Sequence, residues 1–306
     1  MNTVRLSGII RMTRIRRLAV TAVAIVALAG CASGPALVET FAGDIERAPM
    51  TYDGTDRTYF VVDGAVEDEP AALVVALHGA EVSSVEAFMV ETGWHEKAME
   101  VGAVVVFPEG TPSGGRLGWN AFGCCGAAQS NGVDDEGFVL AVIDEVMGGR
   151  SIDPDRVYLT GKSNGAMLTS QIVAGHGDRF AAGAMVVGTV FEGATTPEEP
   201  APMVLVNLQD DPIVPHDPDA RPGIIGRMLF DRPVLGAVES AGWWVDANRA
   251  NQTPERTDFA SGYRELYSAS DGGSDVLFVS LVNGGHVWPR GEFDATDEIW
   301  SFFERP

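Results

Sequence analysis

The sequence is poor in cysteine, histidine and lysine, and this limits the chemistry that it can support. Its 306 residues include three cysteines, five histidines and two lysines, Lys97 and Lys162. These residues show no metal-ligand spacing, so we expect neither a metal nor a cofactor. The scarcity of lysine beside plentiful arginine fits either a salt-adapted acidic protein or the codon bias of a GC-rich genome.

Positive charge is scarce throughout the chain. Lysine and arginine together number 21 against 43 aspartates and glutamates, which gives a formal net charge of −22. Five of the arginines fall within residues 1–30, which contain no acidic residue, so the remainder of the chain carries a net charge of −27. For a chain this acidic we expect no nucleic acid and no anionic polymer as a partner.

The apolar run over residues 18–28 is too short to span a membrane. As a helix its 11 residues would reach about 16 Å, roughly half of the hydrocarbon core. Because the run follows an arginine-rich stretch, it is typical of a secretory signal, whether translation begins at Met1 or at Met12.

The apolar run ends in Leu28-Ala29-Gly30-Cys31, which looks like a bacterial lipobox. Cys31 would then receive a diacylglyceryl group, although an ordinary cleaved signal with an incidental cysteine is the alternative. We expect a lipoprotein signal peptide over residues 1–30 and a tether over residues 31–50. The protein is then extracytoplasmic, either lipid-anchored to the cell membrane or secreted, and its lipid anchor is its only membrane contact.

Cys124 and Cys125 are the two cysteines that are left if Cys31 is acylated. Outside the cytoplasm they could form a disulfide between neighbouring residues. They could equally be two small buried side chains, because such a disulfide forces the intervening peptide out of its usual geometry. The sequence leaves both alternatives open.

Short β-branched runs alternate with helical stretches across residues 51–306, which predicts a single α/β catalytic domain. The hydrophobic fraction of 45% and the charged fraction of 21% suit one globular domain. The alternation predicts a mainly parallel central sheet with helices on both faces. The predicted strands are 57–62, 72–78, 103–107, 156–161, 183–187, 203–207 and 276–281, and the predicted helices are 84–89, 93–101, 134–147, 163–174, 238–250 and 295–303.

The segment Gly161-Lys162-Ser163-Asn164-Gly165 matches G-x-S-x-G, the pattern of a nucleophile on a sharp strand-to-helix turn. The pattern alone is weak, because glycine and serine are common in this chain. Its surroundings strengthen it, since an apolar strand run enters the motif and a helical run leaves it. We therefore predict that Ser163 is a nucleophile.

A serine nucleophile needs a base, and the base needs a carboxylate that orients it. Asp211 follows the predicted strand 203–207, and His286 lies on a glycine-rich loop after the strand 276–281. Their order after Ser163 is the one that this motif predicts. Asp210 competes with Asp211 for the role of the acid, and only the proline that follows Asp211 favours the latter.

The other histidines fit the role of a base less well. His95 and His176 lie in or at the end of predicted helices, and His216 precedes the last strand. His78 ends the strand 72–78, where we expect it to fix a loop.

The tetrahedral intermediate also needs an oxyanion hole, in which each backbone N–H group contributes roughly 3 kcal/mol. Asn164 is one predicted donor, and Ala80, which follows the permissive Gly79, is the other. Trp119 and Trp288 lie in candidate cleft loops and could stack on an aromatic acyl group, although aromatic residues in loops also pack the surface.

Several segments together resemble the polyhydroxybutyrate depolymerase and feruloyl esterase family of secreted α/β-hydrolase esterases, which has lipoprotein members. The resemblance covers most of residues 57–303 and implies an α/β-hydrolase fold with the triad Ser163, Asp211 and His286. The matching segments are 77–79, 92–94, 105–110, 124–126, 133–138, 152–158, 161–165, 211–215 and 284–289.

The chain departs from the family pattern at three places. Asn207-Leu208 stands where a His-Gly pair is usual, Ala166 stands where a second glycine is usual, and Lys162 stands where an apolar residue is commoner. These departures affect the carry-over of substrate specificity more than that of the chemistry.

The features together predict an exported serine esterase that hydrolyses carboxylic esters through an acyl-enzyme on Ser163. Feruloyl, short-acyl and hydroxyalkanoate esters, small or polymeric, all fit the sequence. The alternatives are a serine peptidase of the same fold and a non-catalytic binding lipoprotein. A peptidase would usually need a gating domain or an anchor for a peptide terminus, and a binding protein would be expected to have lost a triad member.

Overall fold

The computed structural model describes residues 45–217 and 221–305. The predicted signal peptide, Cys31 and the first part of the tether lie outside these residues. Within the described part of the chain, no helix is long and apolar enough to cross a membrane.

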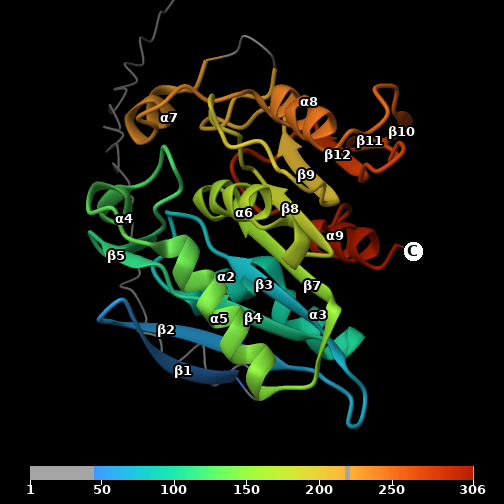
Figure 1. The fold of residues 1–306 in the computed structure, drawn as a ribbon. Coiled ribbons are helices and arrows are strands. Elements are labelled where there is room, and N and C mark those ends of the chain that lie inside the picture. Colours follow the sequence, from blue (N-terminus) through green and yellow to red (C-terminus); the bar gives the residue numbers. More distant parts are fainter. Residues whose placement is uncertain (1–44, 218–220, 306) are drawn as a thin grey trace, which may run out of the picture. The chain divides into compact units, whose positions relative to one another are not determined.

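A ten-stranded sheet forms the centre of the described residues (Figure 1). Its strands are β1 (Ile45–Tyr52), β2 (Thr55–Asp63), β3 (Ala71–Leu77), β4 (Val104–Pro108), β7 (Ile152–Lys162), β8 (Ala182–Val186), β9 (Met203–Leu208), β10 (Glu255–Phe259), β11 (Gly262–Tyr267) and β12 (Val276–Leu281). They lie in the order β1-β2-β4-β3-β7-β8-β9-β12-β11-β10. The six strands from β4 to β12 in this order are parallel to one another, and the two strands added at each edge pair in antiparallel fashion.

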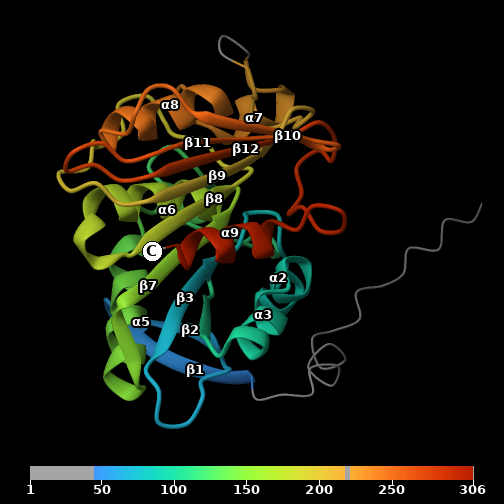
Figure 2. The same ribbon diagram turned by 90° about the vertical axis from the view of Figure 1, so that its right-hand side faces the viewer.

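Helices cover both faces of this sheet, as the sequence predicts. One face carries α5 (Asp135–Gly149), α6 (Asn164–Gly175) and α8 (Ala237–Ala247), and the other carries α2 (Val85–Thr92), α3 (Trp94–Val101) and α9 (Ala295–Phe303). In Figure 2, α9 lies in front, and α2 and α3 lie to the right. Shorter elements are β5 (Thr111–Ser113), β6 (Arg116–Gly118), α4 (Gly126–Ser130), the 3₁₀ turn Gly177–Arg179 and α7 (Ile224–Leu229).

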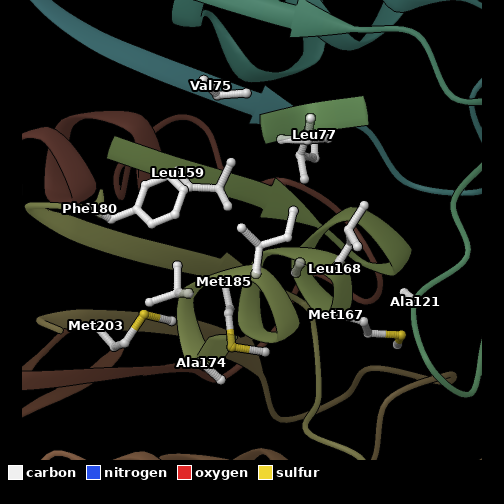
Figure 3. Close-up of a cluster of buried hydrophobic side chains, with 14 of the residues drawn as sticks. Val75, Leu77, Ala121, Leu159, Met167, Leu168, Ala174, Phe180, Met185 and Met203 are labelled. Atoms are coloured by element: carbon white, nitrogen blue, oxygen red, sulfur yellow. The ribbon is translucent and has the colours of Figure 1, made fainter. Parts of the chain in front are cut away.

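The alternation of side chains along β3 explains why the central strands are apolar throughout. Leu73, Val75 and Leu77 join the core under α5 and α6, whereas Val74 and the alanines beside it join the core under α2 and α9. Figure 3 shows the first of these cores, in which Leu159 and Leu168 pack between the sheet and α6. Complete burial of such a side chain stabilises the fold by about 1.5–3 kcal/mol.

Two corrections concern the edges of the sheet. Residues 45–50, predicted to belong to the tether, form most of β1, which pairs with β2 from Ile45↔Val62 to Tyr52↔Thr55. The turn between them is Asp53-Gly54, with φ of 47° and 71°, a dipeptide typical of tight hairpins. The edge strands β10 and β11 were also not predicted, because their half-exposed sequences lack an apolar run.

The order of the strands indicates at which edge of the sheet a ligand-binding site is expected. The chain passes from β3 to β4 on one side and then crosses to β7 on the other, so the strand order reverses at β3. In open α/β sheets, ligands bind at the carboxyl ends of the strands beside such a reversal. The loops that follow β3, β7, β9 and β12 all begin at the carboxyl ends of these parallel strands, and so at the same edge of the sheet.

Candidate active site

Ser163 lies on the sharp turn between β7 and α6. Its backbone has φ 52° and ψ −118°, a conformation that non-glycine residues rarely adopt and that costs of order 1–3 kcal/mol. Its backbone N–H donates to the carbonyl oxygen of Val186 at 2.9 Å. The serine is held in a strained position, which is the geometry that the G-x-S-x-G motif predicts.

The two glycines of the motif are required by close backbone contacts. A Cβ at Gly165 would lie 2.3 Å from the carbonyl oxygen of Leu77, and one at Gly161 would lie 2.4 Å from the carbonyl group of Gly165. The turn therefore packs directly against the end of β3. Ala166 fits in place of a further glycine because it faces Gly188, where an added Cβ would come within 2.5 Å of the Ala166 methyl group.

His286 connects Ser163 to Asp211. Its Nε2 lies 2.8 Å from Ser163 Oγ, and its Nδ1 lies 2.7 Å from Asp211 Oδ2. The side chain of Asp211 is 1% exposed and that of His286 9%. The three side chains thus run from a buried carboxylate to a hydroxyl group that can meet a substrate.

The loop after β9 fixes the Asp211 carboxylate. Its Oδ1 accepts hydrogen bonds from the backbone N–H groups of Ile213 at 2.8 Å and Val214 at 3.0 Å. The other oxygen, Oδ2, is then directed at the imidazole. This local turn is common where aspartate precedes a proline-containing loop.

Asp210 has a different partner. It accepts the backbone N–H groups of Gly284 at 3.3 Å and Gly285 at 2.9 Å, two glycines with positive φ that precede His286. The structure therefore places Asp211, and not Asp210, against the imidazole. Asp210 instead supports the turn that carries His286.

His78 is buried and bridges two loops. The backbone N–H of Gly110 donates to its Nε2 at 3.0 Å, so its proton lies on Nδ1, which donates to the Gly79 carbonyl oxygen at 2.9 Å. Burial lowers the pKa of His78 to about 4, so that it is neutral at pH 7. The remaining histidines bond elsewhere: His95 to Met89, His176 to Glu136, and His216 to Asp217 and Ser280.

Trp119 and Trp288 do not line a cleft, contrary to the prediction. Trp119 is fully buried and its indole N–H donates to the carbonyl oxygen of His78 at 2.8 Å. Trp288 is 3% exposed, and its indole N–H donates to Thr296 Oγ1 at 3.0 Å. With both rings enclosed, neither indole face is available to a substrate.

A cavity of about 160 Å³ lies along α6, beyond the turn at Ser163. The sequence analysis did not identify it. Its lining includes Phe122, Met167, Gln171, Phe191 and Trp243. Among the aromatic residues of this lining, Phe122 has an exposed side chain, at 38%.

Asp135 is the first residue of α5. In the structure it is buried, pairs with Arg57 at 2.8 Å, and accepts the backbone N–H of Asn120 at 2.7 Å. Burial raises its pKa. Two consecutive acids at a helix start do not reveal which one turns inward, and here Asp134 forms the cap by accepting the Gly137 N–H.

Cys124 and Cys125 form a disulfide between neighbouring residues, across a cis peptide bond. Of the two alternatives left open by the sequence, the structure has the disulfide, and both side chains are buried. The backbone N–H of Cys125 donates to the Trp119 carbonyl oxygen at 2.9 Å. Among the described residues, no group of three or more histidines, cysteines or acids could hold a metal ion.

Comparisons with known proteins find similarity to esterases. The family model described as Esterase PHB depolymerase matches residues 57–214, which include Ser163 and Asp211. NocK of Nocardia uniformis subsp. tsuyamanensis, named as an esterase, is 30% identical over 74% of this chain and 67% of its own length. Poly(3-hydroxyalkanoate) depolymerase C of Paucimonas lemoignei is 26% identical over 72% of this chain and 55% of its own length.

Other relatives are considerably longer than the matched region. The chain spans 36% of an acetylxylan esterase of Coprinopsis cinerea and 37% of feruloyl esterase B of Piromyces equi. Among solved structures, the acetyl xylan esterase from Aspergillus awamori has a TM-score of 0.61 at 15% identity, covering 85% of this chain and 99% of that one. With the strand order, this similarity confirms the predicted α/β-hydrolase fold.

Proposed function

The chain belongs to the esterase PHB depolymerase family, and from this premise we propose that it hydrolyses carboxylic esters through an acyl-enzyme on Ser163. The observation that carries the proposal is that His286 bonds to Ser163 through one ring nitrogen and to Asp211 through the other. A hydroxyl group, an imidazole and a buried carboxylate in this order form a unit that activates serine.

Each member of the unit has one task. His286 Nε2 takes the hydroxyl proton as Ser163 Oγ attacks the ester carbonyl carbon, and then delivers that proton to the departing alcohol. A water molecule repeats the sequence to release the acid. Asp211 keeps the proton of the neutral imidazole on Nδ1 and stabilises the imidazolium that forms. These steps use neither a metal nor a cofactor.

The oxyanion is stabilised by the backbone N–H groups of Asn164 and Ala80. Asn164 is the first residue of α6, where the helix dipole is positive. Ala80 follows β3, and the contact of Gly165 with the carbonyl groups of Leu77 and His78 brings that loop against the serine turn. Donors fixed in advance contribute about 3 kcal/mol each to the transition state.

The catalytic domain is tied to the membrane through Cys31. Support comes from the arginine-rich start, the short apolar run and the lipobox of the sequence. Residues 45–50 belong to β1 and are therefore part of the globular domain rather than of the tether.

The substrate belongs to the acyl esters for which the relatives are named, which include hydroxyalkanoate, feruloyl and acetylxylan esters. A test of the catalytic proposal is labelling with a fluorophosphonate, followed by mass spectrometry of the modified peptide. We expect one label on Ser163 and a burst of product on an activated ester. Labelling of another residue, or undiminished hydrolysis after complete labelling of Ser163, would overturn the proposed mechanism. A panel of phenolic, short-acyl and hydroxybutyrate esters then ranks the substrates.

A further inference from the structure

Lys162, the residue before the nucleophile, is buried although it is charged. It ends β7 and is 3% exposed. Its Nζ lies 2.6 Å from Glu81 Oε1 and also forms an ion pair with Glu91. A buried ammonium group is costly unless it is paired, and here two carboxylates hold it. The mechanism described above does not use this cluster.

The two carboxylates come from elements that adjoin the active site. Glu81 directly follows Ala80 in the loop after β3, and Glu91 lies in the last turn of α2. Glu91 Oε1 also accepts the backbone N–H of Trp288 at 3.4 Å, two residues beyond His286. A single ammonium group therefore connects the loop of the proposed oxyanion donor with the loop of the base.

The Glu81 carboxylate lies close to the backbone of the oxyanion loop. It folds back so far that a Cβ at Gly79 would lie 2.2 Å from Glu81 Oε2. An unpaired anion at this position would oppose the negative charge that develops on the substrate. Burial alone would lower the pKa of Lys162, but the two carboxylates outweigh it and raise the pKa, so that the balancing charge is present.

We propose that Lys162 is a positioning residue for ester hydrolysis, which holds the Ala80 and His286 loops in register with Ser163 and neutralises Glu81 beside the oxyanion. This inference rests on the proposed function of Ser163. Lysine is otherwise rare in the chain, and it stands in the motif at the position where this cluster needs a cation. Because its ammonium group is buried and paired with Glu81 and Glu91, Lys162 acts through the two loops.

Lys97 provides a matched control. Its Nζ also lies between two carboxylates, 2.7 Å from Glu100 and 2.6 Å from Asp297, and its side chain is 11% exposed. It links α3 to α9, and both of its partners lie outside the loops that carry Ser163, Asp211 and His286. Lys162→Met and Lys97→Met thus remove the same kind of cluster from two places.

The experiment measures kcat and KM on p-nitrophenyl acetate, together with the rate of fluorophosphonate labelling. For Lys162→Met we expect kcat and the labelling rate to fall together by about ten- to a hundredfold with KM within about twofold, because the loss lies in the transition state. Lys162→Arg should recover most of the loss, and Lys97→Met should keep wild-type kcat. Ser163→Ala tests the proposed function separately.

Unchanged kcat in folded Lys162→Met, beside an inactive Ser163→Ala, would overturn the role of Lys162 and leave the esterase mechanism in place. Equal losses in Lys97→Met and Lys162→Met would also overturn it, since a general loss of stability would then explain both. If Lys162→Met does not fold, Glu81→Gln and Glu91→Gln take its place. Each should lower kcat several-fold, and wild-type kcat in both would refute the proposal.

Discussion

The side chain of Asn164 and the backbone of Trp119 hydrogen-bond to each other in both directions. The Trp119 N–H donates to Asn164 Oδ1 at 2.7 Å, and Asn164 Nδ2 donates to the Trp119 carbonyl oxygen at 3.1 Å. The residue after the nucleophile thus has two tasks, because its backbone N–H is the proposed oxyanion donor while its side chain fixes the loop over the turn. That loop in turn bonds to His78, beside Ala80.

Asn164→Ala keeps the backbone N–H but leaves the buried Trp119 N–H without its partner, whereas the Trp119 carbonyl oxygen still accepts the N–H of Cys125. We expect it to lower the free energy of unfolding by about 1–3 kcal/mol and kcat by about tenfold. Asn248, at the C-terminal end of α8, is the control. Its side chain forms the same reciprocal pair with the backbone of Ala201, in which Nδ2 donates to the carbonyl oxygen at 2.7 Å and Oδ1 accepts the N–H at 3.3 Å. Asn248→Ala should lose similar stability in denaturant titrations and keep wild-type kcat. A normal kcat in folded Asn164→Ala would contradict the positioning role of the loop.

Ser163→Ala and His286→Ala should each lower kcat on an activated ester by about a thousandfold or more, with folding intact. The reason is that hydroxyl group, imidazole and carboxylate act as one unit, so the loss of one removes most of the covalent pathway. Asp211→Asn should lower kcat by a smaller but still substantial factor, because it favours the wrong tautomer of His286. Steady-state kinetics beside circular dichroism spectra check this, and wild-type turnover in Ser163→Ala would refute the hydrolase mechanism.

Asp210 tests whether the acid is assigned to the correct residue. Asp210→Asn keeps an acceptor for the Gly285 N–H, so we expect kcat to fall only a few-fold. Asp210→Ala removes both acceptors from the turn before His286 and should cost about tenfold. The comparison with Asp211→Asn uses the same kinetic assay, and a greater loss in Asp210→Asn than in Asp211→Asn would show that the acid is misassigned by one residue.

The central strands and their helices were predictable because they are buried on both faces. A strand such as β3 has to be apolar throughout, and the helix between two parallel strands has its own period, so the alternation is visible in the sequence. The edge strands β10 and β11 are stabilised by pairing rather than by an apolar run, and they were missed. The hairpin of β1 and β2 could have been predicted from the turn dipeptide Asp53-Gly54, which a search for apolar strand runs does not consider.

Within the site, motif and chain order predicted the residues that the structure brings together, Ser163, Asp211 and His286. The roles of Trp119 and Lys162 could not be predicted in this way. An aromatic residue in a loop and a lysine in a motif are both expected to be accessible, and their burial depends on partners distant in the sequence. Lys162 forms ion pairs with Glu81 and Glu91, which precede it by 81 and 71 residues in the sequence, and a local sequence pattern cannot predict such a contact.

Cys31→Ala should release the protein from the membrane fraction. Without the thiol no diacylglyceryl group can be attached. The proposal includes no other membrane anchor, and no helix in the described part of the catalytic domain can span a membrane. Fractionation followed by an esterase assay checks it, and the released protein should keep the kcat of the wild-type domain. Retention of the variant in the membrane fraction would contradict the lipid anchor.

The buried His78 predicts a pH dependence of stability that runs opposite to that of a histidine paired with an acid. Burial lowers its pKa from 6.5 to about 4 in the folded chain. Above pH 6.5 the ring is neutral in both states and its effect is absent. As the pH falls from 6.5 to 4, the unfolded chain binds a proton that the folded chain does not, so the free energy of unfolding decreases by about 1.4 kcal/mol per pH unit, or about 3 kcal/mol by pH 4.

His78→Gln keeps a polar side chain that can bond to Gly79 or Gly110 but cannot take up this proton. Its stability at pH 7 should be lower than that of the wild-type protein, because the fit of the ring is lost, whereas its further decrease between pH 6.5 and pH 4.5 should be smaller. Denaturant titrations of both proteins at several pH values measure the two slopes, and the carboxylates common to both cancel in the difference. Parallel slopes would show that His78 is not neutral in the fold, and the tautomer that holds Gly110 would then be assigned wrongly.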